Sequence, residues 1–463
     1  MTLISKEEKS LKTSILIVTA IAAFLPSLLF TALVLGLPAI GNEFNANAIE
    51  LGWILNSFTL SSGIFMLISG KLGDIFGRKK ILSLGLFLYA LSTLFISLSP
   101  NVYLIIALRV VQGIANAMVY GTVIAIVSSV FKKGERGRAV GINLTATYLG
   151  MSLGPFFGGF LTQYLGWRSV FLFLAPCFLL TLILCQLRIK TEWSDSAGEK
   201  FDIKGSLAYS FALLGIMYGF SILPSLAAWI ILGAGLLFGI LFFFTELKVE
   251  NPIFEFKLII YNRLFAFSIL TSIFTYTATA SIGFFSSLFL QYLKGIDATT
   301  AGLIMIAQPM GITLLSTQAG KLSDKFNPGI IASIGLGIIS IGLGLFWFIN
   351  ENTHIAYMIV LLIIIGLGFG IFSSPNTNAI MSSVDKKYLG IASGTLGTAR
   401  TIGQSFSMGI AMMLFSLHMG REVISPAIYP DLLLAIRTGF LVFSIISALG
   451  IIVSLNRNKR NRK

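Results

Sequence analysis

The sequence predicts an all-α membrane protein with many spanning helices, and two observations support this fold class. Hydrophobic residues make up 56% of the 463 residues and charged residues only 11%, whereas roughly a quarter of the residues in soluble domains are charged. Apolar runs of about twenty residues recur along the chain, each long enough to cross roughly 30 Å of hydrocarbon. A strand of a membrane barrel needs only about ten residues of alternating polarity, so these continuous runs indicate helices.

Fourteen apolar runs follow one another. The first begins near Thr13; it is too long for the apolar part of a signal peptide and lacks a small-residue cleavage site, so we interpret it as a spanning helix. Pro38 and Pro155 lie within spans, where neighbouring helices can satisfy the freed backbone groups. The predicted spans are 14–39, 51–70, 81–98, 102–130, 138–164, 168–187, 205–223, 227–246, 264–290, 299–319, 329–349, 355–375, 389–416 and 433–455.

The basic residues indicate how the spans are oriented. If both termini are cytoplasmic, the tails and inner loops hold most of the 33 lysines and arginines, as expected for cytoplasmic segments. The placement of the net charge of +14 favours this orientation over nucleic-acid binding, and we expect the basic tail to act as an orientation signal that can contact anionic lipid. The exceptions are Arg109, Arg168, Lys294, Arg400, Arg421 and Arg437.

An internal repeat divides the chain into two halves. The sequence GKLGDIF, from Gly70 to Phe76, recurs as GKLSDKF from Gly320 to Phe326. Both copies follow the second helix of a six-helix half if the seventh and eighth spans are an insertion. We therefore predict a six-helix bundle at 1–188, a linker with two additional helices at 189–263, a second six-helix bundle at 264–455 and a basic cytoplasmic tail at 456–463.

Three motifs carry a resemblance to a known family. The segment GKLGDIFGRKK, from Gly70 to Lys80, resembles the signature loop of the major facilitator superfamily. Leu108–Gly113 and Gly150–Gly159 are similar to further motifs of the family, the second to one seen in its antiporters. With fourteen spans, the Asn251-Pro252 linker, and the run Ala392-Ser393-Gly394 through Arg400 and Gly403, the chain resembles the fourteen-helix drug:proton antiporter branch, of the multidrug efflux type.

This resemblance implies the major facilitator fold and a function. It implies a secondary active transporter of the plasma (inner) membrane that exports lipophilic drugs or related small molecules by alternating access. Protons are the implied coupling ion, and we expect a monomer in the lipid bilayer. An importer or facilitator of one metabolite is the alternative within transport.

An enzyme is less favoured, because no acid, base or nucleophile cluster is apparent. No GxxxxGK[ST] motif for ATP occurs, and neither a cofactor nor a metal is predicted, because the two histidines, His354 and His418, stand alone.

The loop after the second span is a candidate conformational latch. Its small residues permit a tight turn, and Asp74 can pair with Arg78 or sit at a helix N-terminus. An ordinary charged loop that serves topology is the alternative. The resemblance implies a latch composed of Gly70, Gly73, Asp74, Gly77 and Arg78, with Asp324 in the second copy.

Arg109 lies within an apolar span, where a cation costs a few kcal/mol even on lenient scales. Such a residue normally faces a cavity or a partner, and Gln112 is one turn away. Snorkelling to the membrane surface is the alternative. The resemblance implies that Arg109, Gln112, Gly113 and Arg400 contribute to coupling or to a cavity.

The fifth span carries small residues at a spacing of four. Gly150, Gly154 and Gly158 share one helix face, where small residues let another helix approach closely, and Pro155 adds a bend. The resemblance implies an antiporter-type hinge formed by these residues and Gly159.

All nineteen acidic residues belong to loops, tails or span ends, which departs from relatives with a carboxylate in the first span. With Arg109 and Arg400 as inner charges, we favour neutral or anionic amphiphiles over organic cations as substrates. Interhelical hydrogen bonding is an equally good interpretation of each neutral polar residue within the spans. The candidate cavity residues are Asn56, Asn143, Tyr148, Tyr276, Gln308 and Asn376.

Overall fold

The computed structural model describes residues 2–131, 135–196, 198–249, 252, 254, 256–384 and 389–457. In this part, thirteen helices are long and apolar enough to span a membrane, and the remaining predicted span is the more polar helix α5 (Arg136–Leu165). The described elements are helices joined by turns, with a single isolated bridge between Asn47 and Val423. The predicted all-α membrane fold is confirmed.

The N-terminal half contains six long helices. Helix α1 packs along α5, α2 along α4, and α3 against α4 and α6. The helices are α1 (Thr2–Phe44), α2 (Ala48–Phe76), α3 (Arg78–Ser97), α4 (Val102–Val130), α5 (Arg136–Leu165) and α6 (Arg168–Arg188).

The C-terminal half repeats this packing with interrupted helices. Helix α13 packs against α15, α14 against α15 and α17, and α10 against α16. The predicted spans 264–290 and 299–319 are each divided into shorter helices. The hydrophobic pattern of the sequence does not reveal where these helices meet. The elements are α10 (Arg263–Thr279), α11 (Ile282–Leu288), η1 (Phe289–Leu293), α12 (Ala298–Met305), α13 (Ala307–Lys325), α14 (Pro328–Leu345), η2 (Phe346–Phe348), α15 (Ile355–Ser382), α16 (Leu389–Met419), η4 (Pro426–Ile428) and α17 (Tyr429–Asn456).

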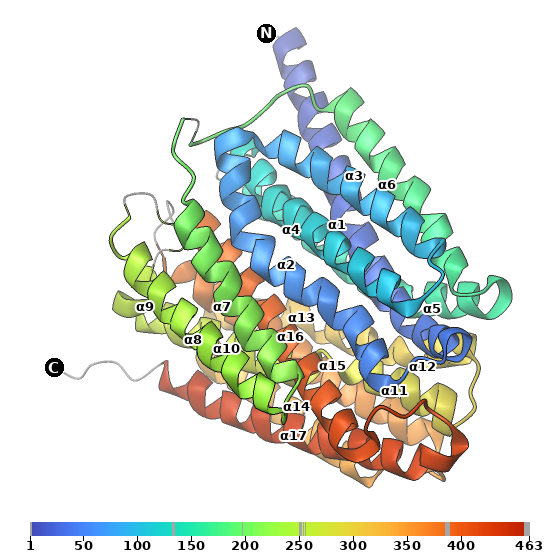
Figure 1. Cartoon of the computed structure of the whole chain (residues 1–463). Coiled ribbons are helices and arrows are strands. Elements are labelled where there is room, and N and C mark those ends of the chain that lie inside the picture. Colours follow the sequence, from blue (N-terminus) through green and yellow to red (C-terminus); the bar gives the residue numbers. More distant parts are fainter. Residues whose placement is uncertain are drawn as a thin grey trace.

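Two further long helices form a hairpin beside the seam between the halves. Helices α7 (Ile203–Ser221) and α8 (Leu226–Glu246) pack against each other, and α7 also contacts α2 and α16 (Figure 1). A Cβ atom at Gly215 would lie 2.7 Å from the Cα of Gly235, so these glycines let the two helices touch. The short helix α9 (Phe256–Tyr261) follows.

The two halves contact each other along α2 and α16, and hydrogen bonds also tie α1 to the C-terminal half on one side of the bundle. We call the side on which α1 begins and α17 ends the terminal side. On the opposite side, Ser287 of α11 donates a hydrogen bond to the carbonyl of Val34 (2.8 Å), and Gln291 of η1 donates to that of Leu35 (3.2 Å). Tyr292 donates to the carbonyl of Pro38 in the same way (3.2 Å). These contacts hold the last third of α1 against the C-terminal half.

Candidate functional site

Three tyrosines lie around Arg400 where the halves face each other. Arg400 is on α16, and its guanidinium carbon is 5.5 Å from the ring centre of Tyr276 on α10. Tyr148 on α5 and Tyr120 on α4 lie within electrostatic range of the same guanidinium. Its Nε atom is buried without a hydrogen-bond partner among the described residues. We call Arg400, Tyr276, Tyr148 and Tyr120 the central cluster; it offers aromatic faces and a spare donor between the halves.

Contacts to both halves fix the tyrosines of the central cluster. The Tyr120 hydroxyl lies 2.7 Å from Ser27 Oγ and donates to the carbonyl of Ala23 (3.0 Å), both on α1. The Tyr148 hydroxyl lies 3.3 Å from Ser373 Oγ on α15, in the other half. A motion that separates the halves must therefore break the Tyr148–Ser373 contact.

Tyr120 was not among the residues predicted from the sequence, although a signal for it exists. Arg109, Gln112, Asn116 and Tyr120 follow one another at spacings of three and four, so they share one face of α4. Asn116 donates a hydrogen bond to Ser62 on α2 (2.8 Å). This polar stripe leads along α4 from Arg109 to the central cluster.

Arg109 is fully buried inside the N-terminal half. Its Nε donates to the carbonyl of Ile54 (2.9 Å) and its Nη1 to Oε1 of Gln112 (2.5 Å). Gln112 in turn donates to Thr93 on α3 (2.7 Å), and the guanidinium carbon lies 4.2 Å from the ring centre of Phe58. The side chain thus points into the bundle, and snorkelling does not describe its geometry.

Gly113 explains how Arg109 reaches the backbone of α2. A Cβ atom at Gly113 would lie 2.3 Å from the carbonyl oxygen of Phe58 and 2.0 Å from Ser61 Oγ. No side chain fits there without separating α4 from α2. The motif residues Arg109, Gln112 and Gly113 therefore form one structural unit.

Glycines on one face of α5 let this helix pack closely on α1. Added Cβ atoms would lie 2.5 Å from the carbonyl oxygen of Phe24 at Gly150, and 2.2 Å from that of Ala32 at Gly158. Gly154 has the same environment, with a Cβ atom only 1.9 Å from Thr31 Oγ1. This face packs on α1, as small residues at a spacing of four permit.

The adjacent face of α5 meets the other half. A Cβ atom at Gly159 would lie 2.2 Å from the carbonyl oxygen of Ala298, and one at Gly302 would lie 2.3 Å from that of Pro155. Thus α5 is in close backbone contact with α1 and with α12 at once, which places the candidate hinge residues on the seam between the halves.

Four of the six candidate cavity residues lie outside the central cluster. Asn56 is fully buried and accepts a hydrogen bond from Thr59 on its own helix (3.4 Å), and Asn143 donates to the carbonyl of Ala139 (3.1 Å). Gln308 is half-buried on α13. Only Tyr148 and Tyr276 of this set are in the central cluster.

Asn376 is engaged by a residue that the sequence assigned to the basic tail. Arg457 is 4% exposed, and its Nη1 donates to Oδ1 of Asn376 (2.8 Å). Its Nη2 donates to Ser454 (2.9 Å) and to the carbonyl of Gly329 (3.1 Å). Arg457 thus ties α14, α15 and α17 together and does not belong to a solvated tail. Residues 458–463 lie outside the described part.

The latch loop forms a compact ion-pair network on the terminal side. The guanidinium of Arg78, 7% exposed, donates to Oδ1 of Asp74 (2.8 and 2.5 Å), to Oδ2 of Asp195 (2.7 Å) and to Ser129 at the end of α4. Gly77 has φ +115°, and a Cβ atom there would lie 2.5 Å from the carboxyl carbon of Glu192. Gly77 is therefore required both by its backbone conformation and by its neighbour.

The partners of the latch loop come largely from the segment between α6 and α7. Glu199 pairs with Lys71 (2.6 Å). Asp195 pairs with Arg78, and the backbone N–H of Lys79 donates to Glu192 (2.8 Å). We call residues 192–199 the strap; their acidic side chains neutralise the basic loop.

Not all latch residues are engaged alike. Gly73 lies where a Cβ atom would be 3.1 Å from Thr122, whereas a Cβ atom at Gly70 would have no neighbour within 4 Å. The side chain of Asp324 lies outside the described residues, so its role stays a prediction.

Comparisons with known proteins give the family. The family model of the Major Facilitator Superfamily matches residues 19–408 and 268–463. The riboflavin transporter RibZ of Clostridioides difficile is 28% identical, with 86% of this chain and 87% of that protein covered. The quinolone resistance protein NorB of Staphylococcus aureus is 26% identical, with 88% and 89% covered.

A further relative and a solved structure agree with this family. The multidrug resistance protein Stp of Mycobacterium tuberculosis is 26% identical over 85% of this chain and 74% of that protein. The fold matches the crystal structure of a bacterial homologue of the human lysosomal transporter Spinster, with a TM-score of 0.70, 16% identity, and 96% and 97% of the two chains covered. The chain belongs to the Major Facilitator Superfamily and is a multi-pass membrane transporter, not an enzyme.

Proposed function

We propose that this transporter binds its substrate at the central cluster and moves it by rocking the two halves about that site. One observation carries the proposal: Arg400 and Tyr276 of one half share a cluster with Tyr120 and Tyr148 of the other. A ligand held there contacts both halves, so its binding free energy can bias their relative position.

The cluster favours a substrate with an aromatic, neutral or anionic character. Tyrosine faces suit planar rings, and the unpartnered Arg400 donor suits an acceptor oxygen. Carboxylates in the described helices lie only near helix ends, so a cationic drug would meet no counter-charge in the membrane interior. We therefore favour export of lipophilic neutral or anionic molecules.

We also propose that the chain belongs to the fourteen-helix drug:proton antiporter branch and that it exchanges its substrate for protons. Relatives named for quinolone and multidrug resistance support export, and the α7–α8 hairpin supports the division into 1–188, 189–263 and 264–455. We place the chain in the plasma membrane with both termini cytoplasmic, as a monomer, because most basic residues then face the cytoplasm.

Dye quenching in everted vesicles tests coupling and substrate class together. A proton gradient is imposed, and anionic, neutral and cationic lipophilic compounds are added in turn. We expect anionic or neutral compounds to dissipate the gradient only when the protein is present, and Arg109→Ala to abolish the effect. Accumulation of a compound without gradient dissipation would refute proton exchange, and dissipation by cationic compounds alone would refute the substrate class.

Specific uptake of one metabolite is the second candidate. It is favoured by the riboflavin transporter among the relatives and by the tyrosines near Arg400, because aromatic faces suit a planar ligand. Saturable uptake of riboflavin into intact cells, with no efflux of drugs from the same cells, would establish this alternative over export.

A further inference from the structure

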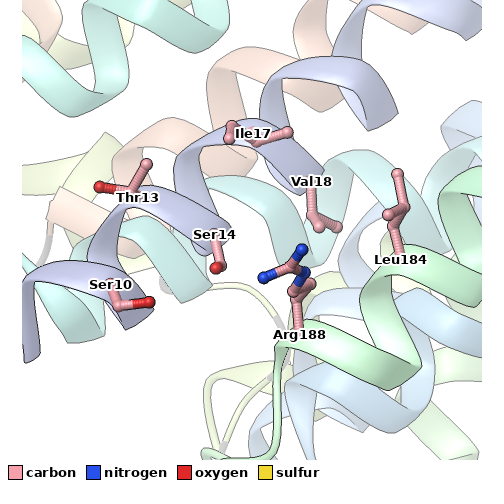
Figure 2. A pocket seen from close by; sticks show the side chains of 7 residues that line it. All are labelled: Ser10, Thr13, Ser14, Ile17, Val18, Leu184 and Arg188. Atoms are coloured by element: carbon pink, nitrogen blue, oxygen red, sulfur yellow. The ribbon is translucent and has the colours of Figure 1, made fainter. Parts of the chain in front are cut away.

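A groove lies between α1 and α6 on the terminal side, away from the central cluster. Its volume is about 510 Å³, and Figure 2 shows residues from both helices along it. Ser10, Ser14, Ile17 and Val18 contribute from α1, and Leu184 and Arg188 from α6. None of the lining residues is acidic.

The groove has a polar end at the level where the spans end. Arg188 is the last residue of α6, and its guanidinium turns toward Ser14 in Figure 2. Within the described part of the chain, the side chains of Arg188, Ser10 and Ser14 form no hydrogen bond or ion pair, whereas Ser27, further along α1, donates to the carbonyl of Ala23 (3.1 Å). This end therefore keeps its hydrogen-bonding capacity.

Three cations on the terminal side are neutralised within the protein. Lys12 pairs with Glu135 (2.9 Å), Lys71 with Glu199 (2.6 Å) and Arg78 with two carboxylates. Arg188 is exposed and has no such partner among the described residues. Arg188 therefore keeps a free charge at the groove, and Lys190, two residues further on, likewise has no ion pair with a described residue.

The other end of the groove is apolar. Val18 lies one helical turn beyond Ser14, and Leu184 one turn before Arg188, so both lie about 5.4 Å deeper along their helices. Ile17 is 52% exposed beside them. The groove thus has a cation and hydroxyls where the spans end, and apolar side chains deeper between two membrane helices. A phospholipid has its groups in the same order, with the phosphate at the membrane surface and the acyl chains deeper.

We propose that this groove binds one anionic phospholipid of the leaflet on the terminal side. The phosphate accepts hydrogen bonds from the planar Arg188 guanidinium, which suits phosphate geometry, and from Ser14 and Ser10. The first part of an acyl chain lies along Val18 and Leu184. The lipid holds the start of α1 against the end of α6, and this role is independent of the transported substrate.

Lipid titration of the purified full chain tests the proposal. Native mass spectrometry measures retention of phosphatidylglycerol against phosphatidylcholine for the wild type, Arg188→Gln, Arg188→Lys and the control Lys190→Gln. The control removes the same charge two residues away, outside the groove. We expect Arg188→Gln to weaken phosphatidylglycerol binding about tenfold, the loss of roughly one charge-assisted hydrogen bond; Arg188→Lys keeps part of the binding, and Lys190→Gln all of it.

Three results would overturn the proposal. Equal binding by the wild type and Arg188→Gln would exclude the site, and an equal loss in Lys190→Gln would show only general basicity. Thermal unfolding in lipid-free detergent checks that Arg188→Gln is folded, so that a loss of binding is specific. Stabilisation by inorganic phosphate equal to that by phosphatidylglycerol would reduce the groove to a plain anion site.

Discussion

The Nη2 atom of Arg78, the first residue of α3, lies 2.5 Å from Asp74 in the last turn of α2 and 2.7 Å from Asp195 on the strap. One guanidinium therefore links the end of α2 to the segment that leads into the α7–α8 hairpin. Because the strap and α7 both contact elements next to the seam, this link is placed to respond when the halves move.

Asp74→Asn and Asp195→Asn are expected to slow transport without abolishing substrate binding. Each change leaves the buried Arg78 guanidinium with one carboxylate fewer, and Asp74→Asn has the larger effect because Asp74 accepts two of its hydrogen bonds. Initial transport rate and substrate affinity are measured on the same vesicles. Glu351→Gln, an exposed loop residue on the opposite side, is the matched control. A wild-type rate in Asp74→Asn would rule out the latch.

The Lys71–Glu199 ion pair is not expected to make the transport rate depend on pH near neutrality. The hydrogen bond from Lys71 lowers the pKa of the Glu199 carboxyl below its ordinary value of 4.5. Because this pKa is lowered in the folded protein, the contact stabilises the folded state at pH values above the pKa of the unfolded chain. This stabilisation is lost only as the pH falls through the lower pKa of the folded protein. We expect the transport rates of Glu199→Gln and wild type to keep a constant ratio between pH 6 and 8; a ratio that changes over this range would contradict the assignment.

Gly158→Val is expected to destabilise the protein by roughly 1–3 kcal/mol or to prevent folding, as overpacking does, because the added atoms meet the backbone of Ala32 on α1. Gly141→Ala on the same helix is the matched control, since a Cβ atom there meets nothing within 4 Å. Thermal unfolding in detergent compares the two. Equal unfolding temperatures would show that α1 and α5 are not packed as described.

Arg457→Gln is expected to loosen the terminal side of the C-terminal half. The change removes hydrogen bonds that join α17 to α14 and α15, and leaving their partners unsatisfied costs about 1–3 kcal/mol. A double-mutant cycle with Asn376→Ala isolates the pair, because coupled residues give non-additive losses. Strict additivity would mean that the Arg457–Asn376 contact contributes nothing.

Local patterns in the sequence predicted the spans and the glycine face of α5, because both depend on spacing along one helix. Tyr120 could have been found from its spacing to Arg109 on α4. The contact between Arg457 and Asn376 could not, because it depends on where the end of α17 meets α15. The contacts of the strap could not be predicted either, because an irregular segment has no periodic pattern that indicates which residues it will contact.

Transport by Arg400 variants tests the central claim most directly. Uptake of an active compound into everted vesicles is measured for the wild type, Arg400→Gln, Tyr120→Phe and the control Arg437→Gln, whose arginine contacts Trp347 elsewhere in the C-terminal half. We predict that Arg400→Gln lowers the apparent affinity about tenfold, as loss of a charged hydrogen bond does. Tyr120→Phe has a smaller effect, and Arg437→Gln none. Unchanged affinity in Arg400→Gln, with the protein folded and inserted, would contradict a substrate site at the central cluster.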